Sequence, residues 1–188
     1  MGENNTLFVD NSTYQSNGTC SANCPIVNTS DYRFGRAALT FNGTSTFINF
    51  TRLSYLNMTV QTFALEAWVK PMGGSSGKGT IVGGFNSTRA AIGNGYVLYY
   101  NSTTNKFGFE AAGLGGVGDC GASCNSVSNF AASPFGQWHH VAGVVEVLGS
   151  VMAMKVYVNG ALVSQTNGGP ANLKQIDAFG VGAAIFAN

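Results

Sequence analysis

The chain has 188 residues, of which 9% are charged, and a formal net charge of +1 at pH 7. This length fits one domain with a sizeable core, and the near-neutral charge predicts no basic surface for nucleic acid or an anionic membrane. The longest apolar runs, such as Val141–Val145, are far shorter than the roughly 20 residues of a membrane-spanning helix. We therefore expect residues 1–188 to form a single domain with no membrane span and no nucleic-acid partner.

Short apolar or alternating runs, separated by Gly, Asn, Ser and Pro, recur along the chain and predict β-strands. In chain order they are Ala37–Phe41, Thr46–Phe50, Thr62–Val69, Thr80–Phe85, Tyr96–Tyr100, Lys106–Glu110, Trp138–Val147, Val151–Val158, Ala161–Gln165 and Phe179–Ile185. Asn159-Gly160 predicts a two-residue hairpin turn, because both residues tolerate a positive φ. The pattern predicts an all-β fold, an antiparallel β-sandwich.

The two histidines of the chain are adjacent, His139 and His140, and follow Trp138 inside one predicted strand. Successive side chains of a strand point to opposite faces, so the two imidazoles cannot reach one metal ion from the same side. We expect one histidine to face the core or a groove and the other to face outward. The pattern favours a strand over a catalytic or metal site.

Nine Asn-x-Ser/Thr patterns occur, where chance placement would give about three, which indicates N-glycosylation. The acceptors are Asn4, Asn11, Asn17, Asn28, Asn42, Asn49, Asn57, Asn86 and Asn101. The alternative is a protein rich in Thr and Asn whose polar turns generate the pattern by accident. All nine precede residue 104, so the C-terminal half is expected to hold the uncovered contact surface.

The four cysteines form two C-x3-C pairs, Cys20 with Cys24 and Cys120 with Cys124, each in a loop of small polar residues. Three disulfide connectivities are open, and we favour the two local bridges because each short loop can bring its own sulfurs together. A cross-link between the two loops and a four-cysteine zinc site are the alternatives. Disulfides and glycosylation together predict an extracellular or cell-surface protein, with residues 1–33 as a glycosylated, disulfide-clipped N-terminal segment.

Six segments occur in an order that resembles laminin-G-like, concanavalin-A-like jelly-roll domains. They are "FGRAALTFNGTSTFINF" (Phe34–Phe50), "FALEAWVKP" (Phe63–Pro71), "GYVLYY" (Gly95–Tyr100), "GQWHHVAGVV" (Gly136–Val145), "VYVNGALV" (Val156–Val163) and "FGVGAA" (Phe179–Ala184). The resemblance implies a single jelly-roll domain over most of the chain. It also implies that the Trp-His-His stretch is a structural strand, and that Trp68 and Trp138 are packing residues.

Two strands typical of the resembled domains are missing, one before the region of "FVDNSTYQSNGT" (Phe8–Thr19) and one after "FGVGAA". Those two strands lie side by side in such domains, so their absence implies an edge with unpaired backbone groups. We expect the missing strand to come from further sequence, from a rearranged N-terminus or from a neighbouring identical subunit.

The eight acidic residues show no paired-carboxylate motif of the kind that glycoside hydrolases need, and no G-x-S-x-G motif is present. We therefore expect no catalytic residues. Laminin-G-like domains often hold calcium through loop aspartates, which makes Asp10 and Asp119 candidate Ca²⁺ ligands, although each is also an ordinary turn residue. The sequence assigns no metal site.

Contact with a ligand is expected from aromatic side chains outside the core, and Tyr99, Tyr100 and Phe130 are the candidates. The long glycine-rich loop Ala111–Ser133 is a second candidate contact element. The sequence favours a non-enzymatic extracellular domain that recognises glycan or protein in adhesion. The alternative is a structural subunit of a glycosylated filament, coat or surface layer, assembled by edge-strand pairing.

Overall fold

The computed structural model describes residues 6–50, 54, 56, 62–73, 77–85, 95–112, 125–127, 134–149, 151–170 and 176–182. Strands and turns account for this part of the chain, and no helix of the length and hydropathy needed for a membrane crossing occurs in it. The strands are β1 (Leu7–Phe8), β2 (Gly18–Thr19), β3 (Ile26–Asn28), β4 (Ala38–Thr40), β5 (Phe47–Phe50), β6 (Phe63–Val69), β7 (Lys78–Phe85), β8 (Gly95–Asn101), β9 (Lys106–Ala112), β10 (Asn125–Val127), β11 (His139–Leu148), β12 (Val151–Val158), β13 (Ala161–Pro170) and β14 (Ala178–Gly182).

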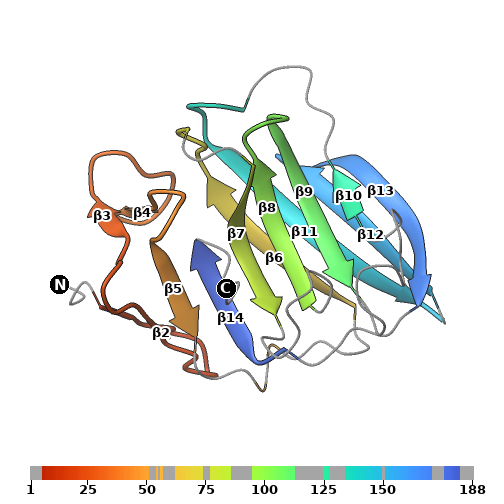
Figure 1. Ribbon diagram of the computed structural model, residues 1–188, viewed down its shortest axis with the longest axis horizontal. Coiled ribbons are helices and arrows are strands. Elements are labelled where there is room, and N and C mark those ends of the chain that lie inside the picture. The colour runs from red at the N-terminus through yellow and green to blue at the C-terminus, as the bar shows by residue number, and fades with distance from the viewer. Residues whose placement is uncertain are drawn as a thin grey trace.

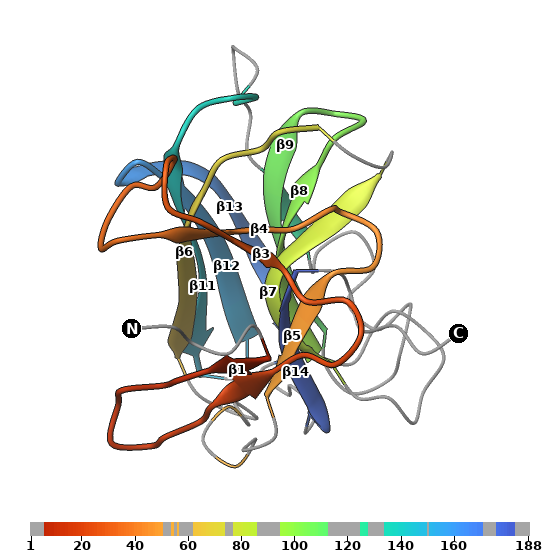
Figure 2. The same ribbon diagram turned by 90° about the vertical axis from the view of Figure 1, so that its left-hand side faces the viewer.

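The strands form two facing antiparallel sheets and a small ribbon (Figure 1). The eight-stranded sheet has the order β1-β2-β5-β14-β7-β8-β9-β10, the four-stranded sheet has the order β13-β12-β11-β6, and β3 pairs with β4. Contacts of β11 and β12 with β9, and of β6 with β7, place one sheet over the other. Figure 2 shows the two layers from the side. The predicted antiparallel β-sandwich is confirmed.

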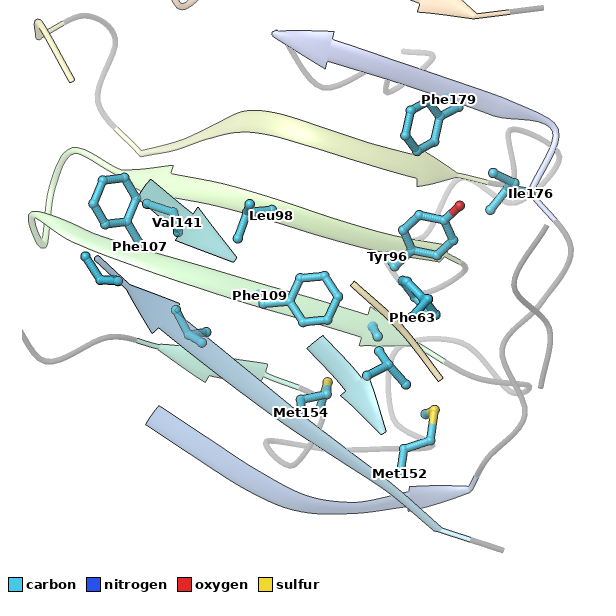
Figure 3. Close-up of a cluster of buried hydrophobic side chains, with 14 residues drawn as sticks. Phe63, Tyr96, Leu98, Phe107, Phe109, Val141, Met152, Met154, Ile176 and Phe179 are labelled. Atoms are coloured by element: carbon cyan, nitrogen blue, oxygen red, sulfur yellow. The ribbon is translucent and has the colours of Figure 1, made fainter. Parts of the chain in front are cut away.

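The core lies between the two sheets, where alternate side chains of each strand point inward. Met152, Met154 and Val156 of β12 are all 1% exposed or less, and they face Phe107 and Phe109 of β9, which are 0% exposed. Figure 3 shows this cluster, with aromatic rings from the larger sheet lying over the methionines of the smaller one. The residues between them in sequence point to the outer faces, which fixes the side on which each candidate site residue lies.

Each strand expected from the sequence is present, and the differences lie in short or extended elements. The sequence did not predict β1, β2, β3 and β10, which have two or three residues and so carry almost no periodic signal. β10 also lies inside the loop predicted at Ala111–Ser133, and pairs with β9. Residues 183–185 of the last predicted strand lie outside the described ranges.

The hairpin between β12 and β13 turns at Asn159-Gly160, as the sequence predicts. The φ angles are 52° for Asn159 and 82° for Gly160, both in the left-handed region that a two-residue turn of this kind requires. β13 then continues to Pro170, five residues beyond the prediction, because β12 remains alongside it, with register shifts between Val151 and Ala153 and between Val156 and Tyr157. The turn places Asn159 at the end of the four-stranded sheet.

Candidate functional site

The adjacent histidines lie on opposite faces of β11. His139 is 8% exposed and points inward, with its ring centroid 5.8 Å from that of Phe107. His140 points to the outer face of the four-stranded sheet, beside Trp68 on β6, with which it is in register. The prediction of one inward and one outward imidazole is confirmed, and the outward one leads to the candidate site.

An open pocket of about 600 Å³ lies where the outer face of the four-stranded sheet meets the segment that connects β3 to β4. Its lining residues come from separate parts of the sequence: Arg33, Trp68, Trp138, His140 and Asn159. Two indoles and an imidazole give it aromatic walls, while the guanidinium and the amide supply polar groups. Such a mixture of aromatic surface and a few fixed polar groups is typical of small-molecule sites.

Asp31 holds the indole of Trp138 in place. One carboxylate oxygen accepts a hydrogen bond from Trp138 Nε1 at 3.0 Å, and the other accepts one from Lys70 Nζ at 2.7 Å. The hydrogen bond from Lys70 and then that from Trp138 lower the pKa of Asp31 below its ordinary value of 3.8. The carboxylate is thus ionised at neutral pH and fixes Trp138 relative to the segment that carries Arg33.

We expect Asp31→Asn to destabilise the protein at neutral pH and to have a smaller effect in acid. The folded-state pKa lies below 3.8, so the contribution of the Asp31 carboxylate is complete above that value and is lost as the pH falls through the folded-state pKa. Urea unfolding of both proteins at a series of pH values checks this. A difference in unfolding free energy that stayed constant down to pH 2 would contradict it.

Trp68 is enclosed by three neighbours on the outer face. The guanidinium carbon of Arg33 lies 4.9 Å from the centroid of the Trp68 ring, Phe34 packs against it edge-on at 5.2 Å, and the His140 ring lies at 5.5 Å. Arg33 also lies over the Phe34 ring at 5.4 Å, and within the described ranges it has no carboxylate partner. Its guanidinium therefore combines a cation–π contact with hydrogen-bond donors that a ligand can use.

Asn159 closes the pocket and is itself fixed by the strand beside it. Its backbone N–H donates to the carbonyl of His140 at 2.8 Å, and its Oδ1 accepts from the His140 N–H at 3.0 Å. Its Nδ2 lies 3.2 Å from Nδ1 of His139. The hairpin turn thus ties both histidines to the same amide, so that the pocket wall and the core move together.

Glu66 approaches His140 across the two strands, with Oε2 3.4 Å from Nε2. This neighbour of His140 is not evident from the sequence, because Glu66 and His140 are far apart along the chain and meet through the pairing of β6 with β11. The other two glutamates that the sequence placed in strands are bonded to lysines, Glu110 to Lys78 and Glu146 to Lys155.

The aromatic residues of the pocket differ from those that the sequence favoured for ligand contact. Tyr99 is 2% exposed, so the prediction of an exposed contact is wrong for this residue; its ring is covered outside the core cluster, with Lys78 Nζ 4.8 Å from the ring centroid. Tyr100 is half-buried, packs on Phe107 at 5.4 Å, and donates its hydroxyl to Asn105. Phe130 lies outside the described ranges. Trp68 and Trp138, predicted to be packing residues, line the pocket instead.

The described glycosylation acceptors lie in turns and strands outside the four-stranded sheet, and one of them, Asn28, accepts a hydrogen bond from the N–H of Asp31 beside the pocket. Asn11 and Asn42 are exposed, Asn17, Asn28, Asn49 and Asn101 are half-buried, and Asn4, Asn57 and Asn86 lie outside the described ranges. The side-chain oxygens of four acceptors cap backbone N–H groups of nearby residues: Asn17, Asn28, Asn42 and Asn101. Each therefore has a structural role in its turn, whether or not it carries a glycan.

The first cysteine pair forms the predicted local disulfide, Cys20–Cys24. Cys120, Cys124 and the candidate calcium ligand Asp119 lie outside the described ranges.

The other candidate calcium ligand, Asp10, uses both carboxylate oxygens within its own loop, where they accept from the N–H and hydroxyl of Ser12 and from the N–H of Ser16. These hydrogen bonds lower the pKa of Asp10 and make it a turn residue. The described residues contain no cluster of three or more metal-ligating side chains.

Comparisons with known proteins agree with this architecture. The sequence model of the Laminin_G_3 family, described as the concanavalin A-like lectin/glucanases superfamily, matches residues 42–184. An endo-1,3-beta-glucanase from Streptomyces sioyaensis is similar in structure with a TM-score of 0.48 and 14% identity, over 97% of this chain and 73% of that one. The carbohydrate-binding module CBM66 from Bacillus subtilis has a TM-score of 0.38 and 16% identity, over 73% of this chain and 77% of that one.

A search of curated protein sequences finds no match. The family match, in contrast, covers most of the chain, from the turn after β4 to two residues beyond the end of β14. The chain belongs to the Laminin_G_3 family of the concanavalin A-like lectin/glucanases superfamily.

Proposed function

We propose that this chain is a non-enzymatic carbohydrate-recognition domain of an extracellular, N-glycosylated surface protein. The glycan binds in the pocket lined by Arg33, Trp68, Trp138, His140 and Asn159. The observation that carries the proposal is the meeting of two indoles with a guanidinium that has no carboxylate partner among the described residues. Adhesion to a glycan-coated surface is the role that such a domain would serve.

The chemistry of the pocket suits a sugar ring. A sugar presents a face of C–H groups that packs on aromatic rings, and a rim of hydroxyl groups that needs fixed hydrogen-bonding partners. The indoles of Trp68 and Trp138 supply the first, and Trp138 is fixed by its bond to Asp31. Arg33 supplies the second through its N–H donors, which are held above the ring of Trp68.

The four-stranded sheet itself carries no acceptor pattern, and the acceptor Asn28 lies at the end of β3 beside the pocket, where it is hydrogen-bonded to Asp31. None of the nine acceptor patterns falls in β6, β11, β12 or β13, which make up the four-stranded sheet. The Cys20–Cys24 disulfide supports an oxidising compartment, where N-glycosylation also occurs. A ligand that approaches over the strands of this sheet therefore meets exposed protein, whereas a glycan on Asn28 would stand beside the segment that carries Arg33.

Replacing Trp68 by Ala is expected to weaken glycan binding by at least about tenfold, because the substitution removes the aromatic surface on which Arg33 and His140 are arranged. The glycosylated wild-type chain is first screened on an array of mammalian, plant and microbial glycans, and the best ligand is titrated by calorimetry into both proteins. Tyr14→Ala is the matched control, because Tyr14 is an exposed aromatic residue outside the pocket. Equal affinity of wild type and Trp68→Ala, or no glycan bound on the array, would refute the proposal.

A second function is favoured by a different observation. β6 is an edge strand of the four-stranded sheet, and within the described ranges nothing pairs with its second side. An open edge allows a β-sandwich to serve as the structural subunit of a filament, coat or surface layer. This function uses the backbone edge of β6, whereas glycan binding uses side chains of the pocket, and the two surfaces meet at Trp68.

A further inference from the structure

The open edge of β6 presents a regular row of backbone hydrogen-bonding groups. The N–H of His140 donates to Asn159 and its carbonyl accepts from Asn159, so these groups of His140 face away from β6. Val147 is an odd number of residues from His140 along β11, and its N–H points to the opposite side of the strand, where it donates to the side chain of Thr62, the residue before β6. Odd-numbered residues of β11 therefore bond to β6, because the direction of the backbone groups alternates along a strand.

The same alternation assigns the two sides of β6. His139, Val141 and Gly143 are in register with Val69, Ala67 and Leu65, and these pairs exchange the hydrogen bonds between the two strands. The residues between them, Ala64, Glu66 and Trp68, consequently direct their N–H and C=O groups away from β11. Within the described part of the chain these groups point to the outside of the sheet.

The β6 edge carries one charged side chain, Glu66, which is 68% exposed, but it lacks two other features by which proteins usually protect an exposed strand. Phe63–Val69 contains no proline, and its pairing with β11 continues without a register shift. The opposite edge of the same sheet, β13, differs on both counts, because it ends at Pro170 and contains register shifts against β12, and it also contacts β10. Only one of the two edges of this sheet is therefore suited to accept another strand along its length.

The chain also exposes a short apolar segment with free backbone groups at β1. The N–H of Cys20 donates to the carbonyl of Thr6, and Phe8 is in register with Gly18, so Thr6 and Phe8 bond to β2. Leu7 and Val9 lie between and beyond them, and their backbone groups point to the open side of β1, which ends the eight-stranded sheet. Their side chains are 42% and 49% exposed. Apolar side chains and free N–H groups on the same segment make it a suitable partner strand.

We propose that the β6 edge of one copy binds residues 7–9 of a second copy as an added strand. Within one copy these two segments end different sheets, so the pairing occurs between copies (Figure 2). The accepting and the donating surfaces differ, which makes the contact heterologous, and repetition of a heterologous contact gives a ring or an open filament. The inference deepens the structural-subunit function and does not depend on glycan binding at the pocket.

Two proline substitutions test the proposal, each removing one outward N–H. Glu66→Pro blocks the acceptor and Val9→Pro blocks the donor, while the hydrogen bonds to β11 and β2 remain. In the full glycosylated chain, we expect polymers of wild type by light scattering and negative-stain microscopy, and monomers of each variant alone. An equimolar mixture of the two variants is expected to give one-to-one dimers, because each retains the surface that the other lacks.

Glu66→Gln and Val9→Thr are the matched controls, because both keep the backbone N–H, and both are expected to polymerise like wild type. Hydrogen exchange of the wild type alone gives a reading that does not depend on variant folding. The amides of Ala64, Glu66 and Trp68 should exchange at least about tenfold more slowly in concentrated than in dilute protein. A wild-type monomer at all concentrations, slow exchange of these amides in the monomer, or polymerisation of Glu66→Pro would each overturn the proposal.

Discussion

Phe109→Ala is expected to lower the free energy of unfolding by about 3–5 kcal/mol, the largest single effect in this protein. The Phe109 side chain is 0% exposed and lies between the two sheets, with its ring centroid 6.4 Å from that of Phe63 and its atoms against Gly143 of the opposite sheet. Removing the ring leaves a cavity that the neighbouring strands cannot fill, because both are held in regular ladders. Urea unfolding followed by circular dichroism measures the loss.

Phe135→Ala provides the matched control for this experiment. Phe135 is 51% exposed, and its replacement is expected to cost less than about 1 kcal/mol, since most of its surface remains in water in the folded protein. Similar losses for the two variants would contradict the assignment of Phe109 to the centre of the core.

Gly143→Ala is expected to destabilise the sandwich by about 1–3 kcal/mol, although alanine is a conservative change in most strands. A Cβ atom at position 143 would lie 2.3 Å from Cδ2 and 2.4 Å from Cγ of Phe109, well inside van der Waals contact. The Phe109 ring cannot move away, because it is buried on all sides. The new methyl group must therefore separate the two sheets or push the ring out of its rotamer.

Gly79→Ala separates this overpacking from the general effect of replacing a strand glycine. Gly79 lies in β7, its backbone is not in the left-handed region, and an added Cβ would meet only the carbonyl oxygen of Tyr100 at 3.8 Å. We expect Gly79→Ala to be neutral or slightly stabilising, because alanine loses less backbone entropy on folding. A loss of stability at Gly79 equal to that at Gly143 would show that the contact with Phe109 is not the cause.

The fold could be predicted from the sequence because alternation and turn residues are local signals. Val151–Val158 was predicted with its observed bounds, since an alternating run ends at the Asn159-Gly160 turn. Leu7–Phe8 and Gly18–Thr19 were not predicted, because a strand of two residues is defined by its partner rather than by its own pattern. The pairing of β14 between β5 and β7 likewise depends on tertiary structure.

The candidate site could be predicted only in part. The sequence indicated that one of His139 and His140 faces outward. The family resemblance implied that Trp68 is a packing residue, whereas the alternation of β6 carries it to the same outer face as Glu66. Arg33 reaches the pocket from a turn, and no periodicity predicts the face of a turn residue. Aromatic content alone favoured Tyr99, which is 2% exposed and is covered by Lys78.

The most direct test of glycan recognition uses the indole signals of the protein. The chain has two tryptophans, Trp68 and Trp138, and both line the pocket, so a ¹⁵N-labelled sample gives two indole Nε1–H resonances that report on the site. Addition of the glycan selected on the array is predicted to shift both resonances in a saturable manner with the affinity found by calorimetry. Saturable binding of that glycan with both indole resonances unchanged would contradict the account.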